Sequence, residues 1–220
     1  MPQSDVFTLK TLFSREHLPA VLSTLLYMAA AYVAEHFANA YAFEFVTRPT
    51  SNHVGDLILD NIPVLDLNFL IIEGALIVIV FSTIYAFSKP RYLLFTGKII
   101  AIFIMLRAFF ISLTHVVIYP EHISPGLGFF DGIYTYLNFE TGLFFSGHTC
   151  MPLLMALIFW KYARTRYLFL FIAVIAGVSV LFAHIHYSID VFAAPFMAYG
   201  IYHAAKRIFP HDYELTLAAD

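Results

Sequence analysis

The sequence predicts an all-α membrane protein, a polytopic bundle of six transmembrane helices. Composition, the length of the apolar stretches and the placement of basic residues all point to this fold class. Hydrophobic residues make up 60% of the 220 and charged residues 12%, with a mean hydropathy of +0.78. A water-soluble domain of this size needs more polar surface to cover its core, whereas lipid tolerates such a composition.

Six apolar stretches meet or approach the length of about 20 residues that a spanning helix needs. They are 19–41, 69–88, 96–118, 149–163, 167–186 and 190–208. The last contains Pro195 and Gly200, which a helix tolerates inside a bundle where neighbouring groups satisfy the freed backbone. We therefore expect an N-terminal segment at 1–18, a transmembrane domain at 19–208 and a C-terminal tail at 209–220.

Basic residues gather beside the helix ends of one membrane face. That face would hold Lys10, Arg15, Lys89, Arg91, Lys98, Lys161, Arg164, Arg166, Lys206 and Arg207. The opposite face would hold only Arg48, and Arg107 lies within the third stretch. Because basic loops stay on the inside, both termini are predicted to be cytoplasmic.

Several classes of function lack support in the sequence. The net charge of −3 gives no basic field for nucleic acid, and a single cysteine, Cys150, excludes an internal disulfide framework. There is no Gly-rich nucleotide loop, CxxC pair or HExxH motif. We therefore expect no cofactor and no metal.

The first motif that carries chemistry is FSGHT, residues 145–149, at the start of the fourth stretch. Ser146 fits an N-cap, and the backbone N–H groups of Gly147, His148 and Thr149 would face the positive end of the helix dipole. Such a terminus binds phosphate, and glycine lets a ligand approach the backbone. His148 would lie beside a bound phosphate as an acid or base. The alternative is an ordinary capped helix with an interfacial histidine.

The second motif is AHIHYSID, residues 183–190, between the fifth and sixth stretches. His186 and Asp190 are four positions apart, so a helical backbone would place them on one face. A carboxylate that accepts from one imidazole nitrogen fixes the tautomer and raises the basicity of the other nitrogen, as a nucleophilic or general-base histidine requires. The alternative is a pair that only joins two helices.

Arg107 is the third element, in the middle of the third stretch. A guanidinium inside a bundle needs an anion, either phosphate or a carboxylate such as Glu73 or Glu35. The charge distribution places both histidine motifs at the same, non-cytoplasmic face. Ionisable groups at that depth are costly unless they are paired or functional.

The motifs FFSGHT and HYSIDV resemble the two C-terminal motifs of the sphingomyelin synthase-related lipid phosphotransferases, within the type 2 phosphatidic acid phosphatase superfamily. The acidic loop at 54–63 is similar to the first-loop aspartate motif of that family, and the stretch 107–120 is similar to its third-helix motif. The resemblance covers residues 50–208 and makes 19–208 a catalytic domain.

This resemblance implies a phosphohistidine mechanism without a metal. His186 is expected to attack phosphorus, with Asp190 orienting it. His148 is expected to protonate the departing lipid alkoxide and then deprotonate the incoming hydroxyl. The phosphoryl oxygens would be held by Arg107, Ser146, Gly147 and Thr149.

The chain departs from the phosphatase branch of the superfamily at two places. That branch has a lysine–arginine–proline motif, but Ala108 follows Arg107 and no lysine lies seven residues before it. It also has an arginine about six residues before the motif's histidine, where this chain has Ser-Val-Leu at 179–181. Fewer bases favour a phosphodiester headgroup, phosphocholine or phosphoethanolamine. We therefore expect transfer of that headgroup from a glycerophospholipid to ceramide or diacylglycerol at the non-cytoplasmic face, with membrane lipids as the partners.

Two alternatives remain open. A lipid phosphatase or phospholipase C-like hydrolase would use the same residues with water as acceptor. A small transporter or membrane scaffold would instead depend on a mid-depth acid such as Glu73. Side chains that would tune the site from the same face are His115, Glu121, His122, Glu140 and His184.

Overall fold

The computed structural model describes residues 7–46, 54–114, 116–117, 119–122 and 144–217, and all regular structure within them is helical. The long helices are α2 (Leu18–Val46), α3 (Asn68–Ser88), α4 (Pro90–Leu113), α6 (Gly147–Ile158), α7 (Ala163–Phe182) and α8 (Ser188–Ile208). Shorter helices are α1 (Leu9–Leu12), α9 (Pro210–Leu217) and a 3-10 turn, η1 (Leu59–Asn61).

The described helices have the length and surface of membrane spans. Four of them, α2, α3, α4 and α7, are long and apolar enough to cross a bilayer. Their outward side chains include Leu26, Ile77 and Phe171, which are 71%, 62% and 64% exposed. Apolar surface on this scale is compatible with lipid and not with water. The chain is therefore an all-α, polytopic integral membrane bundle, as predicted.

The predicted count of six spans depends on α6 and α8. Helix α6 is apolar but has only 12 residues, and α8 has 21 residues but is more polar, with Lys206 and Arg207 in its last turn. Helix α6 packs inside the bundle, whereas α8 packs on α6 with one face and exposes Phe192, Phe196 and Tyr199 on the other. The two helices complete a six-helix arrangement, with α6 too short to cross a bilayer by itself.

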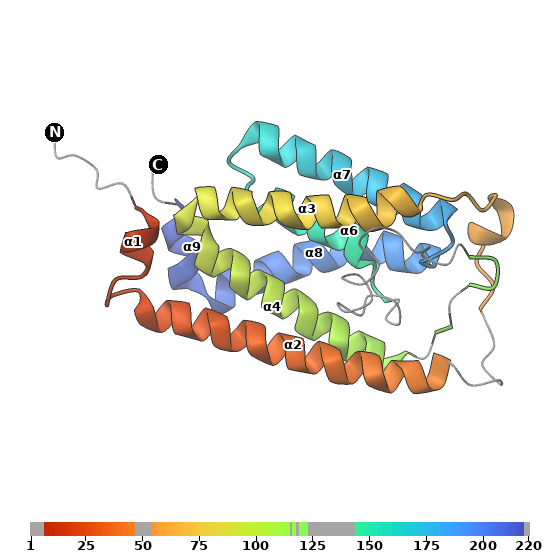
Figure 1. The fold of residues 1–220 in the computed structure, drawn as a ribbon, viewed down its shortest axis with the longest axis horizontal. Helices are drawn as coiled ribbons and strands as arrows, with labels where there is room; N and C mark the ends of the chain where they lie inside the picture. The colour runs from red at the N-terminus through yellow and green to blue at the C-terminus, as the bar shows by residue number, and fades with distance from the viewer. Residues whose placement is uncertain (1–6, 47–53, 115, 118, 123–143, 218–220) are drawn as a thin grey trace.

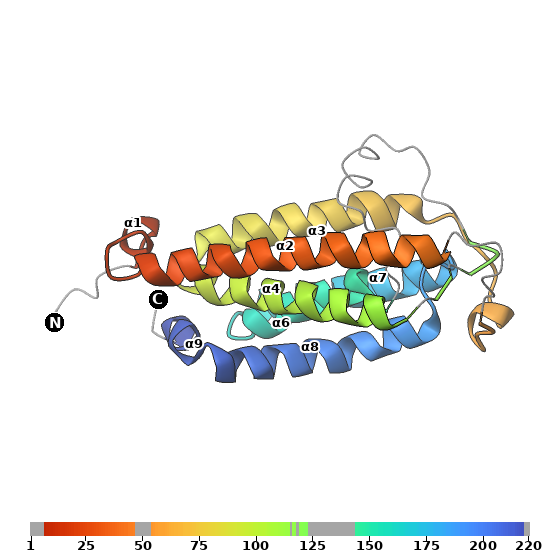
Figure 2. The same cartoon turned by 90° about the horizontal axis from the view of Figure 1, so that it is seen from below.

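Helices α4, α6 and α8 form the centre of the bundle. Their largest buried side chains pack in one cluster that includes Phe95, Phe103, Leu154, Phe159 and Ile201. Helix α2 lies along α4, α7 packs on α6, and α3 contacts α4, α6 and α7. Figures 1 and 2 show the same neighbours from two directions.

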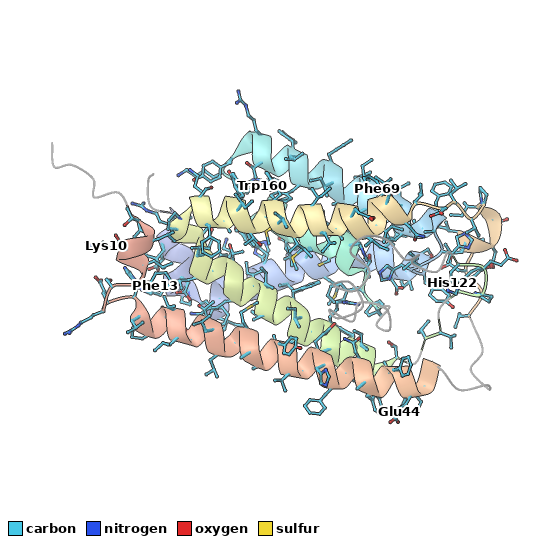
Figure 3. The ribbon with its side chains drawn as sticks, in the orientation of Figure 1. Lys10, Phe13, Glu44, Phe69, His122 and Trp160 are labelled. Carbon is cyan, nitrogen blue, oxygen red and sulfur yellow. The ribbon has the colours of Figure 1, made fainter. Side chains whose placement is uncertain are left out.

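Helices α1 and α9 lie at one end of the bundle (Figure 1). In Figure 3, Lys10 and Phe13 mark that end, and Glu44 and His122 lie at the opposite end. An ion pair between Lys98 of α4 and Asp212 of α9 is buried, with side chains 6% and 5% exposed. The expected tail at 209–220 therefore contains a helix that is anchored to the bundle.

Several helix ends differ from the expected stretches. The first stretch, expected at 19–41, runs to Val46, and the fifth, expected at 167–186, is Ala163–Phe182, so the second histidine motif follows this helix instead of ending it.

Two other differences have local reasons. The third stretch, expected at 96–118, is a helix from Pro90 to Leu113, because proline suits the first helical position and Thr114 is extended. The fourth stretch, expected at 149–163, begins at Gly147, directly after its cap Ser146. Both shifts follow from capping residues rather than from hydropathy.

Candidate active site

Ser146 fixes the first turn of α6. Its Oγ accepts the Thr149 backbone N–H at 3.4 Å and the Thr149 hydroxyl at 3.3 Å, so it is the N-cap that the sequence predicts. The Ser146 N–H in turn donates to the backbone carbonyl of Asp190 at 3.1 Å. This hydrogen bond joins the start of α6 to the start of α8, and so connects the two histidine motifs directly.

His186 and Asp190 meet at the start of α8. His186 Nδ1 lies 3.4 Å from Asp190 Oδ2, and the same oxygen accepts the Tyr187 N–H at 3.0 Å. His186 precedes α8, which begins at Ser188. The spacing predicted that the two side chains would share one face of a helix, and the structure shows that they do not. Instead, Asp190 folds back over the N-terminus of its own helix and reaches the turn before it.

This contact decides which nitrogen of His186 can react. A carboxylate only accepts hydrogen bonds, so Nδ1 carries the proton and Nε2 carries the lone pair. Both side chains are buried, His186 at 4% and Asp190 at 3% exposure. The arrangement orients the imidazole and leaves Nε2 as the nitrogen that is available for chemistry.

His148 faces His186 from the first turn of α6. Their ring centroids are 5.9 Å apart, and the ring planes are inclined at 68°. Side chains at this separation are within reach of one phosphoryl group. The structure therefore brings together the two imidazoles that come from separate motifs.

Arg107 of α4 lies on the other side of the α6 start. A Cβ atom built on Gly147 would stand 3.7 Å from Arg107 Nη1, so the guanidinium lies beside the first turn of α6. Arg107 Nε donates to the Phe145 carbonyl at 3.2 Å, and Nη1 lies 3.5 Å from Glu35 Oε1 of α2. Of the two carboxylates considered from the sequence, Glu35 is thus the partner. Arg107 is only 6% exposed.

An apolar cavity of about 340 Å³ adjoins these groups. Residues of α3 between positions 70 and 79 and residues of α7 between 171 and 180 form its walls. Arg107, Gly147, His148 and His186 also line it. The cavity therefore combines long apolar walls with a small cluster of polar and ionisable groups, which is the usual construction of a ligand site.

Asp56 supports the site from the loop between α2 and α3. Its Oδ1 accepts the N–H groups of Ile58 and Leu59 at 2.9 and 3.2 Å, and its Oδ2 accepts the Ser188 N–H at 2.7 Å. Burial alone would raise the pKa of Asp56, but hydrogen bonds from Ser188, Leu59 and Ile58 outweigh it and leave the pKa lowered. Asp56 therefore caps α8 from a distant part of the chain. The sequence showed an acidic loop but not this role.

The segment after α4 packs over the connection between α7 and α8. The Tyr119 hydroxyl donates to Asp60 Oδ1 at 2.5 Å, and the Tyr187 hydroxyl donates to the Val117 carbonyl at 2.9 Å. The hydrogen bond to Asp60, followed by burial and nearby acids, raises the pKa of Tyr119 to about 12. These contacts connect the segment before α3, the segment after α4 and the connection between α7 and α8.

His184 belongs to this outer layer and not to the cavity. Its backbone has φ 55, in the left-handed region, and its ring packs edge-on against Tyr119 at 5.1 Å. It is 2% exposed, and neither ring nitrogen has a hydrogen-bond partner among the described residues. His122 Nδ1 lies 2.8 Å from the Tyr119 carbonyl, and Glu121 is exposed. His115 and Glu140 lie outside the described residues.

Within the part of the chain that the structure describes, no group of three or more His, Cys, Asp or Glu side chains is arranged to hold a metal ion.

Comparison with known families identifies the segment that carries the site. Residues 141–207 match the model of the PAP2 superfamily C-terminal region. This segment contains His148, His186 and Asp190. The match supports the type 2 phosphatidic acid phosphatase superfamily, whose members are typically phosphatases or phosphotransferases. Comparison with curated proteins and with solved structures gives no significant match.

Proposed function

We propose that this chain is a lipid phosphotransferase of the sphingomyelin synthase type. It moves phosphocholine or phosphoethanolamine from a glycerophospholipid to ceramide or diacylglycerol. The observation that carries the proposal is the pair His148 and His186, 5.9 Å apart at the polar end of an apolar cavity between membrane helices. A phospholipid matches such a cavity, because its acyl chains suit the apolar walls and its phosphate suits the two histidines.

In the first step, Nε2 of His186 attacks the phosphorus of the donor lipid. The N–P bond forms while the P–O bond to diacylglycerol breaks, and protonated His148 gives its proton to the departing oxygen. The Asp190 carboxylate, which accepts from Nδ1, stabilises the positive charge that develops on the His186 ring.

In the second step, neutral His148 accepts the proton of the acceptor hydroxyl. The acceptor oxygen attacks phosphorus, the N–P bond breaks, and His186 returns to its starting state. Arg107 and the Gly147 N–H, which line the cavity, hold the phosphoryl oxygens during both steps. Ser146 and Thr149, which were expected to share this role, instead shape the first turn of α6, because the Ser146 N–H donates to the Asp190 carbonyl and the Thr149 hydroxyl donates to Ser146.

The pairing of Arg107 supports a phosphodiester substrate. Glu35 already lies 3.5 Å from Arg107 Nη1 and offsets part of its charge. Lys98, a second base of α4, is held by Asp212 at the other end of the helix. A site with one partly neutralised guanidinium is better matched to a singly charged phosphodiester than to a doubly charged phosphate monoester.

The test is headgroup transfer by purified protein in vesicles that contain phosphatidylcholine, phosphatidylethanolamine, ceramide and diacylglycerol, with products identified by mass spectrometry. We expect His186→Ala to abolish transfer. His203→Ala is the matched control, because His203 lies on α8, which follows His186, and packs on Tyr199, with ring centroids 4.2 Å apart. Full activity of His186→Ala would contradict the proposed nucleophile.

Two outcomes would support the alternative functions. Release of free phosphocholine without an acceptor lipid, at the rate of transfer, would make the chain a hydrolase with the same residues. Loss of a transport activity in Glu73→Gln, with no effect of His148→Ala, would support the transporter. Glu73 does not line the described cavity, which favours the enzyme.

The proposed orientation places both termini in the cytoplasm and the histidine site toward the non-cytoplasmic face. Its support is the position of α1 and α9 at one end of the bundle (Figure 1) together with the basic residues beside the same helix ends. Accessibility of cysteines introduced at positions 10 and 121 to a membrane-impermeant reagent in intact cells would test this. We expect labelling at position 121 only.

A further inference from the structure

The walls of the cavity are formed by two helices that face lipid. Helices α3 and α7 are both long and apolar enough to span a membrane. Several side chains that line the cavity are also exposed on the outside of the bundle, among them Ile77, Phe171 and Ile175, which are 62%, 64% and 40% exposed. The cavity is therefore bounded by residues at the lipid-facing surface and also by the two histidines.

We propose that the groove between α3 and α7 holds one acyl chain of the donor lipid while its phosphate lies between His148 and His186. This inference rests on the proposed function and names the part of the substrate that the groove recognises. The walls outside the inner cluster are apolar, so the occupant is a hydrocarbon chain. The continuity of these walls with the histidine site makes it the chain of the reacting lipid.

The volume favours one chain over two. At roughly 30 Å³ for each water-sized group, on the order of ten methylene groups fill a cavity of about 340 Å³. That corresponds to the larger part of one acyl chain. The second chain of a diacyl lipid then stays in the surrounding bilayer.

The groove acts by positioning rather than by affinity. Lipid tails are as apolar as leucine, so moving a chain from the bilayer into the groove gains little hydrophobic free energy. A chain held between α3 and α7 does fix the direction from which the phosphorus approaches Nε2 of His186. Orientation of this kind lowers the barrier of a transfer reaction.

Gly74 of α3 is the position at which this groove can be filled. It lines the cavity, and a Cβ atom built there would meet only the Phe69 carbonyl oxygen, at 3.8 Å. A larger side chain would therefore extend into the groove without a clash at its base. Leucine also favours a helix more than glycine does, so Gly74→Leu is expected to fold.

Gly200 of α8 provides a matched control. It is an exposed helical glycine, a Cβ atom there meets nothing within 4 Å, and it does not line the cavity. Gly200→Leu makes the same chemical change on a face outside the groove.

The first measurement is photo-crosslinking in vesicles of phosphatidylcholine that carries a diazirine on one acyl chain, with His186→Ala as the background so that no turnover is needed. We expect labelled peptides from both α3 and α7. Gly74→Leu should lower this labelling at least fivefold relative to labelling of α2, and Gly200→Leu should not change it. Unchanged labelling in Gly74→Leu would contradict the proposal that the groove holds an acyl chain.

The second measurement compares kcat/KM for long-chain phosphatidylcholine with kcat/KM for p-nitrophenyl phosphocholine, which has no acyl chain. Gly74→Leu should lower the first at least tenfold and change the second less than twofold. Equal losses for both substrates would refute the acyl-chain role. Absence of turnover in the wild type, with Gly74-dependent crosslinking intact, would refute the proposed reaction and not the groove.

Discussion

Asp56→Ala tests whether a loop residue that is far from the histidines in sequence stabilises the start of α8 beside them. The Asp56 carboxylate accepts three N–H groups, and one of them, from Ser188 at 2.7 Å, belongs to the first residue of α8. Removing an N-cap acceptor costs about 0.5–2 kcal/mol, and a buried N–H left without a partner costs about 1–3 kcal/mol. These effects overlap, so we expect a loss of about 2–3 kcal/mol of stability.

The assay is thermal unfolding of purified protein in detergent, together with headgroup transfer. For a chain of this size, each kcal/mol lowers the unfolding midpoint by about 2–4 °C. Asp66→Ala is the matched control, because Asp66 is an exposed acid that accepts the Asn68 N–H at 3.2 Å and caps no long-range element among the described residues. Equal midpoints for Asp56→Ala and Asp66→Ala would refute the capping argument.

The same residue predicts a pH dependence. Because the folded-state pKa of Asp56 is lowered, its stabilisation is fully present above the unfolded pKa of about 3.9. It is lost as pH falls through the folded pKa. The stability difference between wild type and Asp56→Asn should therefore be constant from pH 5 to 8 and shrink below about pH 4. A difference that grows on acidification would contradict this sign.

Three further predictions concern other parts of the bundle. His148→Ala should lower kcat of transfer by about 10²–10⁴-fold, the usual contribution of a general acid–base, and a smaller loss would remove that role. Lys98→Ala should cost about 3–5 kcal/mol, because it leaves Asp212 buried and unpaired. Replacing both residues by leucine should recover most of that stability in the same unfolding assay. His184→Gly should keep the fold and most of the activity, since glycine suits φ 55, and loss of activity as complete as in His186→Ala would give His184 a direct role.

Features set by local sequence were predictable. The apolar stretches located the long helices, and Ser146 is the expected cap because capping depends on residues three positions apart. The contact of His186 with Asp190 was expected from their spacing. It forms through a turn, because Asp190 satisfies the N–H of Tyr187 at the helix start.

Features set by long-range packing were not predictable. Asp56 and Ser188 are 132 positions apart, and no local pattern indicates that a loop carboxylate will cap a distant helix. The choice of Glu35 over Glu73 as the partner of Arg107 depends on α2 lying along α4. Likewise, the position of Gly74 in the cavity wall follows only from how α3 packs beside α7.

The short length of α6 limits how far this helix extends across the membrane from its histidine end. Its 12 residues span about 18 Å at 1.5 Å per residue, whereas the hydrocarbon layer is about 30 Å thick. The hydrogen bond from the Ser146 N–H to the Asp190 carbonyl ties the start of α6 to the first turn of α8, whose 21 residues are long enough to cross that layer. Helix α6 therefore falls short of the opposite boundary, and its histidine end stays level with the first turn of α8.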